Sequence, residues 1–140
     1  MFHKIMVAYD ESPEAERALQ VAIDLARAVG AELAVVTVLE PPPFYYSFAM
    51  VGGLPAVRWT EEQSAKFTAL QAKARRQAKA AGLMLDAELI SGDEVGTIID
   101  CTIKHHSDLL VLGLRKHTWL MGSTTRDLSE RAPCALLGIR

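Results

Sequence analysis

Five short apolar segments alternate with four segments of helical periodicity, and this alternation most limits how the chain can fold. Strands that are buried on both faces have nearly continuous apolar sequences, as KIMVAY (residues 4–9) and LAVVTVL (residues 33–39) do. The remaining strands are expected at residues 83–90, 108–112 and 135–139. Strands that alternate with helices predict an α/β fold, in which right-handed crossovers place helices on both faces of a parallel sheet.

The four expected helices have recognisable ends. Ser12 and Pro13 start the first helix, and Gly30 ends it. The second is expected over residues 60–81, because TEEQ at its start has the pattern of a capping box. The third covers residues 94–106 and the fourth residues 124–131. Helical spacing predicts that the third helix buries four apolar side chains, those of Val95, Ile98, Ile99 and Ile103.

The composition excludes several classes of protein. Half of the 140 residues are hydrophobic, which excludes a disordered chain. The net charge of −2 gives no overall field that would favour nucleic acid or an anionic membrane. The apolar segments are shorter than the roughly 18 residues that span a bilayer, and the first residues do not resemble a signal peptide. We therefore expect a single cytoplasmic domain over residues 1–140, with neither nucleic acid nor membrane as a partner.

The cysteines and histidines do not predict a metal site. Cys101 and Cys134 are far apart and form no Cys-x-x-Cys pattern, so neither a disulfide framework nor a zinc site is expected. His105 and His106 are adjacent on a helix, where neighbouring side chains point in different directions. Both cysteines are expected to behave as core residues.

The stretch from Asp108 to Ser123, DLLVLGLRKHTWLMGS, contains the expected functional site. A strand is followed by Gly113, by a basic loop, and then by Gly122 and Ser123 at the start of a helix. Free N–H groups at a helix N-terminus, the helix dipole and the close approach that glycine permits together favour phosphate binding. The alternative is that Gly113 only turns the chain and Ser123 only caps the helix.

Asp10 and Gly113 end the first and fourth expected strands. Ligands of open parallel sheets bind beyond the carboxyl ends of the strands, where the strand order reverses. A carboxylate and a glycine loop would share one crevice if these two strands were neighbours. The residues by themselves leave the strand order open.

A long connection between Pro41 and Trp59 contains most of the aromatic residues. Loops of this length in a small domain are usually functional or flexible. Two interpretations stay open, an aromatic flap that stabilises the core and a segment that covers a ligand or binds a partner.

Three segments together resemble the universal stress protein family: KIMVAYDESPEAERALQVAIDLARAVGAELAVVTVLEP, SGDEVGTIIDCTIKHHSDLLVLG and GSTTRDLSERAPCALLGIR. The resemblance covers nearly the whole chain apart from the connection between Pro41 and Trp59. It implies an open five-stranded parallel sheet of order 3-2-1-4-5, a Rossmann-like fold similar to the adenine nucleotide alpha hydrolases, in which Asp10 and Gly113 are neighbours. It also implies a homodimer joined through the last strand, Ala135–Ile139.

The resemblance further implies a nucleotide site. One branch of the family binds ATP through a glycine, two residues, a second glycine, nine residues, and then Gly with Ser or Thr. Gly113 matches the first glycine, and Gly122 with Ser123 matches the final pair. Asp10 matches the acid near the adenine, and Val38 the second-strand position whose backbone pairs with the adenine edge. The implied ligand is ATP, with Mg²⁺, and the implied binding residues are Ala8, Asp10, Val38, Leu112, Gly113, Lys116, Gly122, Ser123 and Thr124.

The basic loop departs from that pattern. Lys116 stands where the second glycine would fall, and only five residues separate it from Gly122. The Cβ of a lysine keeps phosphate away from the backbone, whereas its ammonium can pair with phosphate. A short, glycine-poor loop with a bulky residue such as Trp119 is also similar to the branch that does not bind ATP.

Two hypotheses therefore stay open. One is a homodimeric stress-response protein that binds ATP and hydrolyses it slowly at most, and the other is a nucleotide-free regulatory dimer. A conventional enzyme is not expected, because the sequence shows no nucleophile–base pair and no Walker motif.

Overall fold

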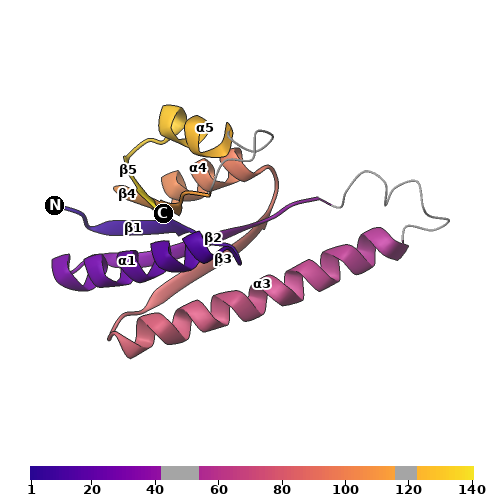
Figure 1. The fold of residues 1–140 in the computed structure, drawn as a ribbon, viewed down its shortest axis with the longest axis horizontal. Coiled ribbons are helices and arrows are strands. Elements are labelled where there is room, and N and C mark those ends of the chain that lie inside the picture. Colours follow the sequence, from indigo (N-terminus) through magenta and orange to yellow (C-terminus); the bar gives the residue numbers. More distant parts are fainter. Residues whose placement is uncertain (42–53, 116–122) are drawn as a thin grey trace.

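The computed structural model describes residues 1–41, 54–115 and 123–140, with the backbone alone for residues 54–57 and 123. Strands and helices alternate along these residues, as the sequence predicts (Figure 1). In chain order they are β1 (Lys4–Ala8), α1 (Pro13–Val29), β2 (Glu32–Leu39), α3 (Leu54–Ala80), β3 (Leu85–Ser91), α4 (Glu94–Lys104), β4 (Leu109–Gly113), α5 (Ser123–Arg131) and β5 (Ala135–Ile139).

The strands described by the structure form one parallel sheet of order β3-β2-β1-β4-β5, which confirms the implied fold. β1 lies at the centre, where Ala8 is aligned with Val36 of β2 on one side and with Leu112 of β4 on the other. The chain leaves β1 toward β2 and later returns to its opposite edge with β4. The strand order therefore reverses between β1 and β4, and the carboxyl ends of these strands are neighbours.

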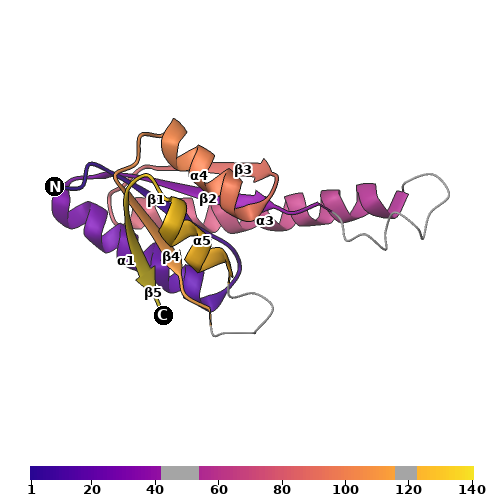
Figure 2. The same ribbon diagram turned by 90° about the horizontal axis from the view of Figure 1, so that it is seen from above.

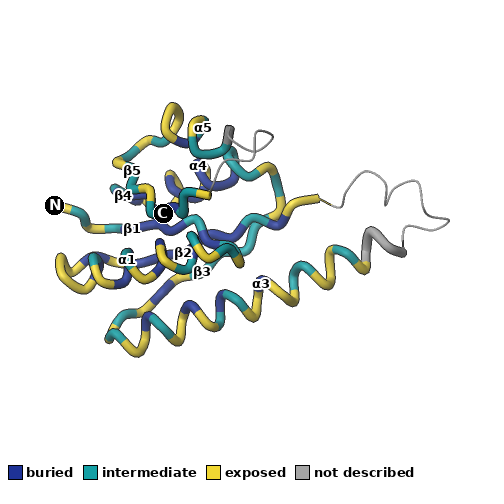
Figure 3. The backbone as a smooth tube through the Cα atoms, in the orientation of Figure 1, coloured by how far each residue is buried: buried dark blue, intermediate teal, exposed yellow. Residues whose placement is uncertain are grey.

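Two helical layers cover the sheet, α1 with α3 on one face and α4 with α5 on the other (Figure 1). Successive side chains of a strand point to opposite faces. Ile5 and Val7 accordingly join the core beneath α1 and α3, whereas Met6 joins the core beneath α4 and α5. Buried residues concentrate along the strands and the inward sides of the helices (Figure 3). No helix in the described part of the chain combines the length and apolar character that a membrane crossing needs.

Helix α1 begins and ends where the sequence predicts. The Ser12 side chain accepts a hydrogen bond from the Ala15 backbone N–H, and Pro13 is the first helical residue. Gly30 ends the helix at φ 71°, a left-handed conformation that glycine adopts without a steric penalty. The N-terminal cap matters for the site, because it fixes the short turn from Asp10 into this helix.

Helix α3 begins at Leu54, so the expected start at Thr60 is wrong. The TEEQ segment lies inside the helix and does not mark its start. Pro55 falls in the first turn, where the N–H that proline lacks has no intrahelical partner in any case. The connection between Pro41 and Trp59 is thus partly helical, and residues 42–53 lie outside the described part. At about 1.5 Å per residue the 27 residues of α3 span about 40 Å, and its first turns extend beyond the sheet, as Figure 2 also shows.

Helix α4 ends at Lys104 rather than at residue 106, and the expected burial of Ile103 is wrong. Its side chain is 54% exposed. The buried stripe of α4 runs through Ile98, Cys101 and Thr102, which are spaced three and four residues apart. Ile103 lies about 40° beyond the buried Ile99, just past the edge of the buried side in the last turn of the helix, where its side chain faces solvent.

Candidate functional site

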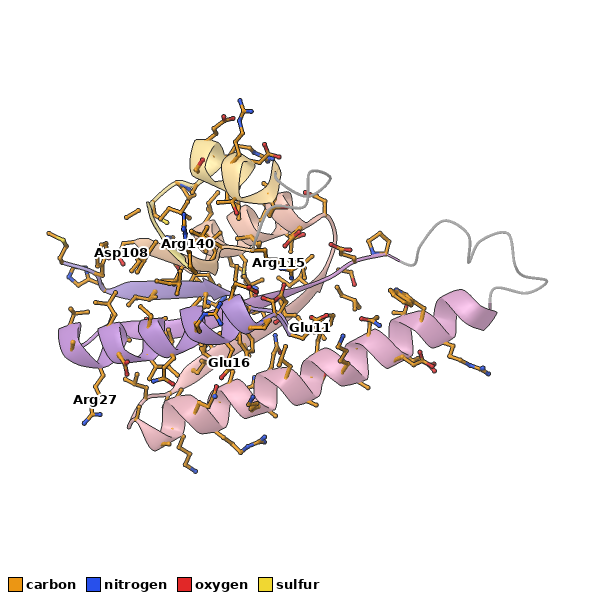
Figure 4. All side chains as sticks on the ribbon, in the orientation of Figure 1. Glu11, Glu16, Arg27, Asp108, Arg115 and Arg140 are labelled. Atoms are coloured by element: carbon orange, nitrogen blue, oxygen red, sulfur yellow. The ribbon has the colours of Figure 1, made fainter. Side chains whose placement is uncertain are left out.

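Asp10 and Arg115 form an ion pair across the point where the strand order reverses. Asp10 follows β1 in the chain. Arg115 lies just beyond the end of β4 (Figure 4). The other carboxylate oxygen of Asp10 accepts a hydrogen bond of 2.9 Å from the Ser12 N–H, which ties it to the start of α1. The side chains of Asp10 and Arg115 remain 29% and 51% exposed, so a ligand can reach both charged groups.

Glu94 adds a second carboxylate to this edge of the sheet. It is the first residue of α4 and accepts a long hydrogen bond of 3.4 Å from the Thr124 hydroxyl of α5. Burial raises the pKa of Glu94, the nearby charge of Glu40 raises it further, and Arg115 opposes these effects. Asp10 and Glu94 therefore place two acidic groups near the Arg115 guanidinium.

Gly113 permits a backbone contact between β4 and α1. A Cβ at this position would lie 2.5 Å from the carbonyl carbon of Glu14 and 2.6 Å from the Ala15 nitrogen. Real Cβ atoms essentially never approach other atoms so closely. Packing alone thus accounts for this glycine, so its presence does not by itself indicate a phosphate.

The structure brings several of the implied binding residues together. Ala8 and Leu112 are aligned partners in β1 and β4, and Asp10 and Gly113 follow at or near the ends of those strands. Val38 lies one strand away in β2, half-buried and aligned with Ile90 of β3.

The remaining implied residues lie at or before the start of α5. Ser123 is the first residue of the helix, one residue earlier than expected, and Thr124 contacts Glu94. Lys116, Gly122 and the bulky Trp119 lie outside the described residues.

Sequence reasoning missed two groups of this edge. Arg115 was included in the basic loop, but nothing along the chain indicated that it pairs with Asp10. Glu94 was recognised only as the first residue of a helix. Its contact with Thr124 joins segments 30 residues apart, so it becomes visible only when α4 and α5 are placed side by side.

The opposite, amino edge of the sheet also joins β1 to β4. The Asp108 carboxylate accepts hydrogen bonds from the backbone N–H groups of His3 (2.8 Å) and Lys4 (3.0 Å). Burial tends to raise the pKa of Asp108, but these backbone hydrogen bonds outweigh it and hold the pKa below its usual value. A cavity of about 210 Å³ lies at this edge, lined by residues that include Lys4, Asp86 and His105. Figure 4 shows Asp108 near the N-terminus and Arg115 at the other end of β4.

Comparison with known proteins identifies the family. The universal stress protein family model matches residues 1–140. A curated relative, the "Universal stress protein in QAH/OAS sulfhydrylase 3'region" of Thermus aquaticus, is 34% identical over 146 residues, which is 100% of both chains.

Solved structures share the fold. The universal stress protein UspA from Lactobacillus plantarum is 25% identical, with a TM-score of 0.78 and coverage of 99% of this chain and 97% of that one. A universal stress protein in complex with cAMP has a TM-score of 0.75 at 22% identity, with coverage of 99% and 97%. An Arabidopsis thaliana family member with AMP bound has a TM-score of 0.66 at 16% identity, with coverage of 98% and 90%. The chain therefore belongs to the universal stress protein family.

Proposed function

We propose that this universal stress protein binds an adenine nucleotide at the carboxyl edge of the sheet, between the ends of β1 and β4. The observation that carries the proposal is the accessible Asp10–Arg115 pair at the reversal of strand order, where open parallel sheets bind their ligands. Proteins with a similar fold are described as complexes with cAMP and AMP, which supports an adenine nucleotide as the ligand.

Arg115 is the described group best suited to a phosphate. Its planar guanidinium can donate two parallel hydrogen bonds to phosphate oxygens. In the structure this group is paired with Asp10, so a phosphate would replace one anionic partner by another. The released Asp10 carboxylate could then accept hydrogen bonds from the nucleoside. Ser123 starts α5, whose free N–H groups offer a further anion site.

ATP is proposed as the ligand in its Mg²⁺ complex. Asp10, Glu40 and Glu94 make the described part of this edge acidic, and that charge opposes a free polyphosphate. Carboxylate oxygens are ligands that Mg²⁺ prefers, and the ion usually binds one or two of them together with phosphate oxygens. With Asp10 assigned to the nucleoside, Glu94 is the described carboxylate that would bind the ion, and the site fits a magnesium nucleotide better than the free anion.

Calorimetric titration of the wild type and variants with ATP and AMP tests the site. Arg115→Ala removes a charge-assisted hydrogen bond worth about 1.5–3 kcal/mol, so it should weaken ATP binding by roughly 10–100-fold. Asp10→Ala should weaken ATP and AMP alike, because Asp10 is assigned to the nucleoside. Arg126→Ala is the matched control, since Arg126 lies on α5 and pairs with Glu130 at the surface. Equal affinities of Arg115→Ala and Arg126→Ala would exclude Arg115 from the site.

A nucleotide-free regulatory dimer is the second candidate function. It is favoured by the same ion pair, because Asp10 and Arg115 already neutralise each other without a ligand. Chromatography of the denatured protein would show whether adenine nucleotide copurifies. A ligand at 100 times its Kd should add about 2.7 kcal/mol of stability. The regulatory function is supported if no nucleotide is released and Mg-ATP does not raise the melting temperature.

Both candidates include a homodimer joined through β5. In the described residues β5 pairs with β4 on one side and has no strand partner on the other. Such an edge presents free N–H and C=O groups, and a twofold copy of the same strand would satisfy them. Light scattering should therefore report a dimer at micromolar concentration. Leu137→Pro should shift the assembly toward monomer, and an unchanged assembly would contradict the proposed interface.

A further inference from the structure

Three side chains with metal-binding atoms converge between β3 and α4. They are Glu88 of β3 and Cys101 and His105 at the end of α4. Cys101 and His105 are four residues apart, so their side chains lie on the same face of the helical turn. Glu88 is aligned with Val36, whose side chain belongs to the core on the α4 face of the sheet. The strand register and the helix repeat therefore direct all three side chains toward one point.

The distances between these atoms are close to those of a metal centre. The Cys101 Sγ lies 3.2 Å from Glu88 Oε2, and the His105 Nε2 lies 3.2 Å from Glu88 Oε1. All three potential ligand atoms lie within 4.8 Å of one another. Tetrahedral zinc with bonds of about 2.0–2.3 Å separates its ligand atoms by roughly 3.4–3.6 Å. Side-chain adjustments on the order of 1 Å would thus complete the geometry.

The immediate surroundings leave the cluster available to an ion. Cys101 is buried, and its thiol donates a hydrogen bond to Glu88. The His105 Nε2 is buried and, among the described atoms, does not form a hydrogen bond of good geometry despite its distance from Glu88. Lys104 lies 2.8 Å from Glu88 Oε1, but its side chain is 68% exposed and can move or stay as an outer partner.

We propose that Glu88, Cys101 and His105 form a binding site for a divalent cation of the zinc class. One sulfur, one imidazole nitrogen and one carboxylate oxygen are ligands that Zn²⁺ accepts, and the fourth position would stay open to water. Binding converts the Cys101 thiol to a thiolate and releases its proton to solvent. His105 also lines the cavity of about 210 Å³ at the amino edge.

This site is independent of the proposed nucleotide site. Helix α4 begins with Glu94 at the carboxyl edge, and His105 follows eleven residues later. At 1.5 Å per residue the two positions are about 16 Å apart along the helix. A variant that abolishes binding at one site therefore still allows binding at the other site to be measured.

Spectrophotometric titration of the metal-free full chain with Co²⁺ tests the proposal. Co²⁺ takes the same tetrahedral ligands as Zn²⁺, and a bound thiolate gives a charge-transfer band in the near ultraviolet. We expect one Co²⁺ per chain, this band, and displacement of Co²⁺ by Zn²⁺, which binds such sites more tightly. Loss of outer-shell partners alone weakens metal binding by about 10–100-fold, so Cys101→Ser and His105→Gln should weaken it by at least that factor.

The chain supplies matched controls for both residue types. Cys134→Ser and His106→Gln remove the other cysteine and the adjacent histidine, and both should retain the band and the affinity. Circular dichroism would identify a variant that fails to fold. In that case protection of Cys101 from alkylation by Zn²⁺ in the wild type replaces the variant. A missing band in the wild type, a band that survives Cys101→Ser, or the absence of protection would each overturn the proposal.

Discussion

Substitution of Gly113 by alanine tests whether this glycine serves packing or a ligand. The added Cβ would lie 2.5 Å from a backbone carbon of Glu14, and ordinary contacts begin near 3.4 Å. The first turn of α1 must therefore move by about 1 Å, since no side-chain rotation can relieve a clash with backbone atoms. Overpacking of this kind costs about 1–3 kcal/mol, from which alanine regains about 0.5–1 kcal/mol of strand preference. Because backbone atoms must move, the upper end of the overpacking cost applies, and about 3 kcal/mol less about 1 kcal/mol leaves an expected net loss of about 2 kcal/mol.

Chemical and thermal denaturation of the nucleotide-free protein measure this loss. An unfolding entropy of about 2.1 cal/mol/K per residue converts 2 kcal/mol into a decrease in Tm of about 7 °C for a chain of this size. Gly138→Ala is the control, because the three atoms nearest to its added Cβ all belong to the side chain of Leu114, at 2.9 Å. That half-buried side chain can rotate, so we expect a change within about 0.5 kcal/mol. The packing argument fails if the two variants are equally stable, and a Gly113→Ala protein that loses only nucleotide affinity would assign this glycine to the ligand.

Three further predictions concern other contacts. Tyr9→Phe removes the 2.8 Å hydrogen bond to Glu16 and should cost about 1 kcal/mol in urea denaturation at neutral pH. Burial tends to raise the pKa of Glu16, but hydrogen bonds from Gln77 and Tyr9 hold it below its usual 4.5. The stabilisation by the Tyr9–Glu16 hydrogen bond is therefore present above pH 4.5 and is lost as the pH falls through the lowered pKa. Below that pKa the variant and the wild type should have the same free energy of unfolding. Asp108→Ala should speed amide hydrogen exchange at His3 and Lys4 by about tenfold, equivalent to about 1.4 kcal/mol, and unchanged exchange would show that this carboxylate does not hold the start of β1. Burial raises the pKa of the Cys101 thiol to about 12, so in metal-free protein at neutral pH Cys101 should react with a thiol reagent more slowly than the half-buried Cys134; the reverse order of rates would contradict the assigned burial.

The sequence predicts the elements of this fold well, because a strand covered on both faces must be apolar at almost every position. Sheet order is different. Nothing in the periodicity of the segments distinguishes one parallel order from another, and the order came from the family resemblance. The start of α3 was missed because Pro55 and the TEEQ segment are competing signals for a helix start. Ile103 lies only about 40° around α4 from the buried Ile99, and helical spacing cannot separate a buried from an exposed position so precisely at the end of a short helix.

Only the site residues that lie at or directly after the end of a strand could be predicted from the sequence. Asp10 and Gly113 belong to that class, and the structure places them at adjacent strand ends. The pairing of Asp10 with Arg115 joins residues 105 positions apart and depends on the strand order. The Glu88–Cys101–His105 cluster was missed for another reason. His105 was compared with His106 along the chain, whereas its structural neighbours come from a residue one helical turn away and from a strand.

β1 is joined to β4 at both ends, and this limits the order in which the strands of the sheet can pair during synthesis. The two strands meet through segments 105 residues apart, and closing a loop of this size costs about 4 kcal/mol of chain entropy. β1 can pair with β2 early, but its other edge stays open until β4 has been synthesised. At about 5–20 residues per second, each new chain carries an unpaired apolar edge at its centre for roughly 5–20 s on the ribosome. Chains truncated before Leu109 would keep that edge open permanently, which makes them substrates for chaperones or for aggregation.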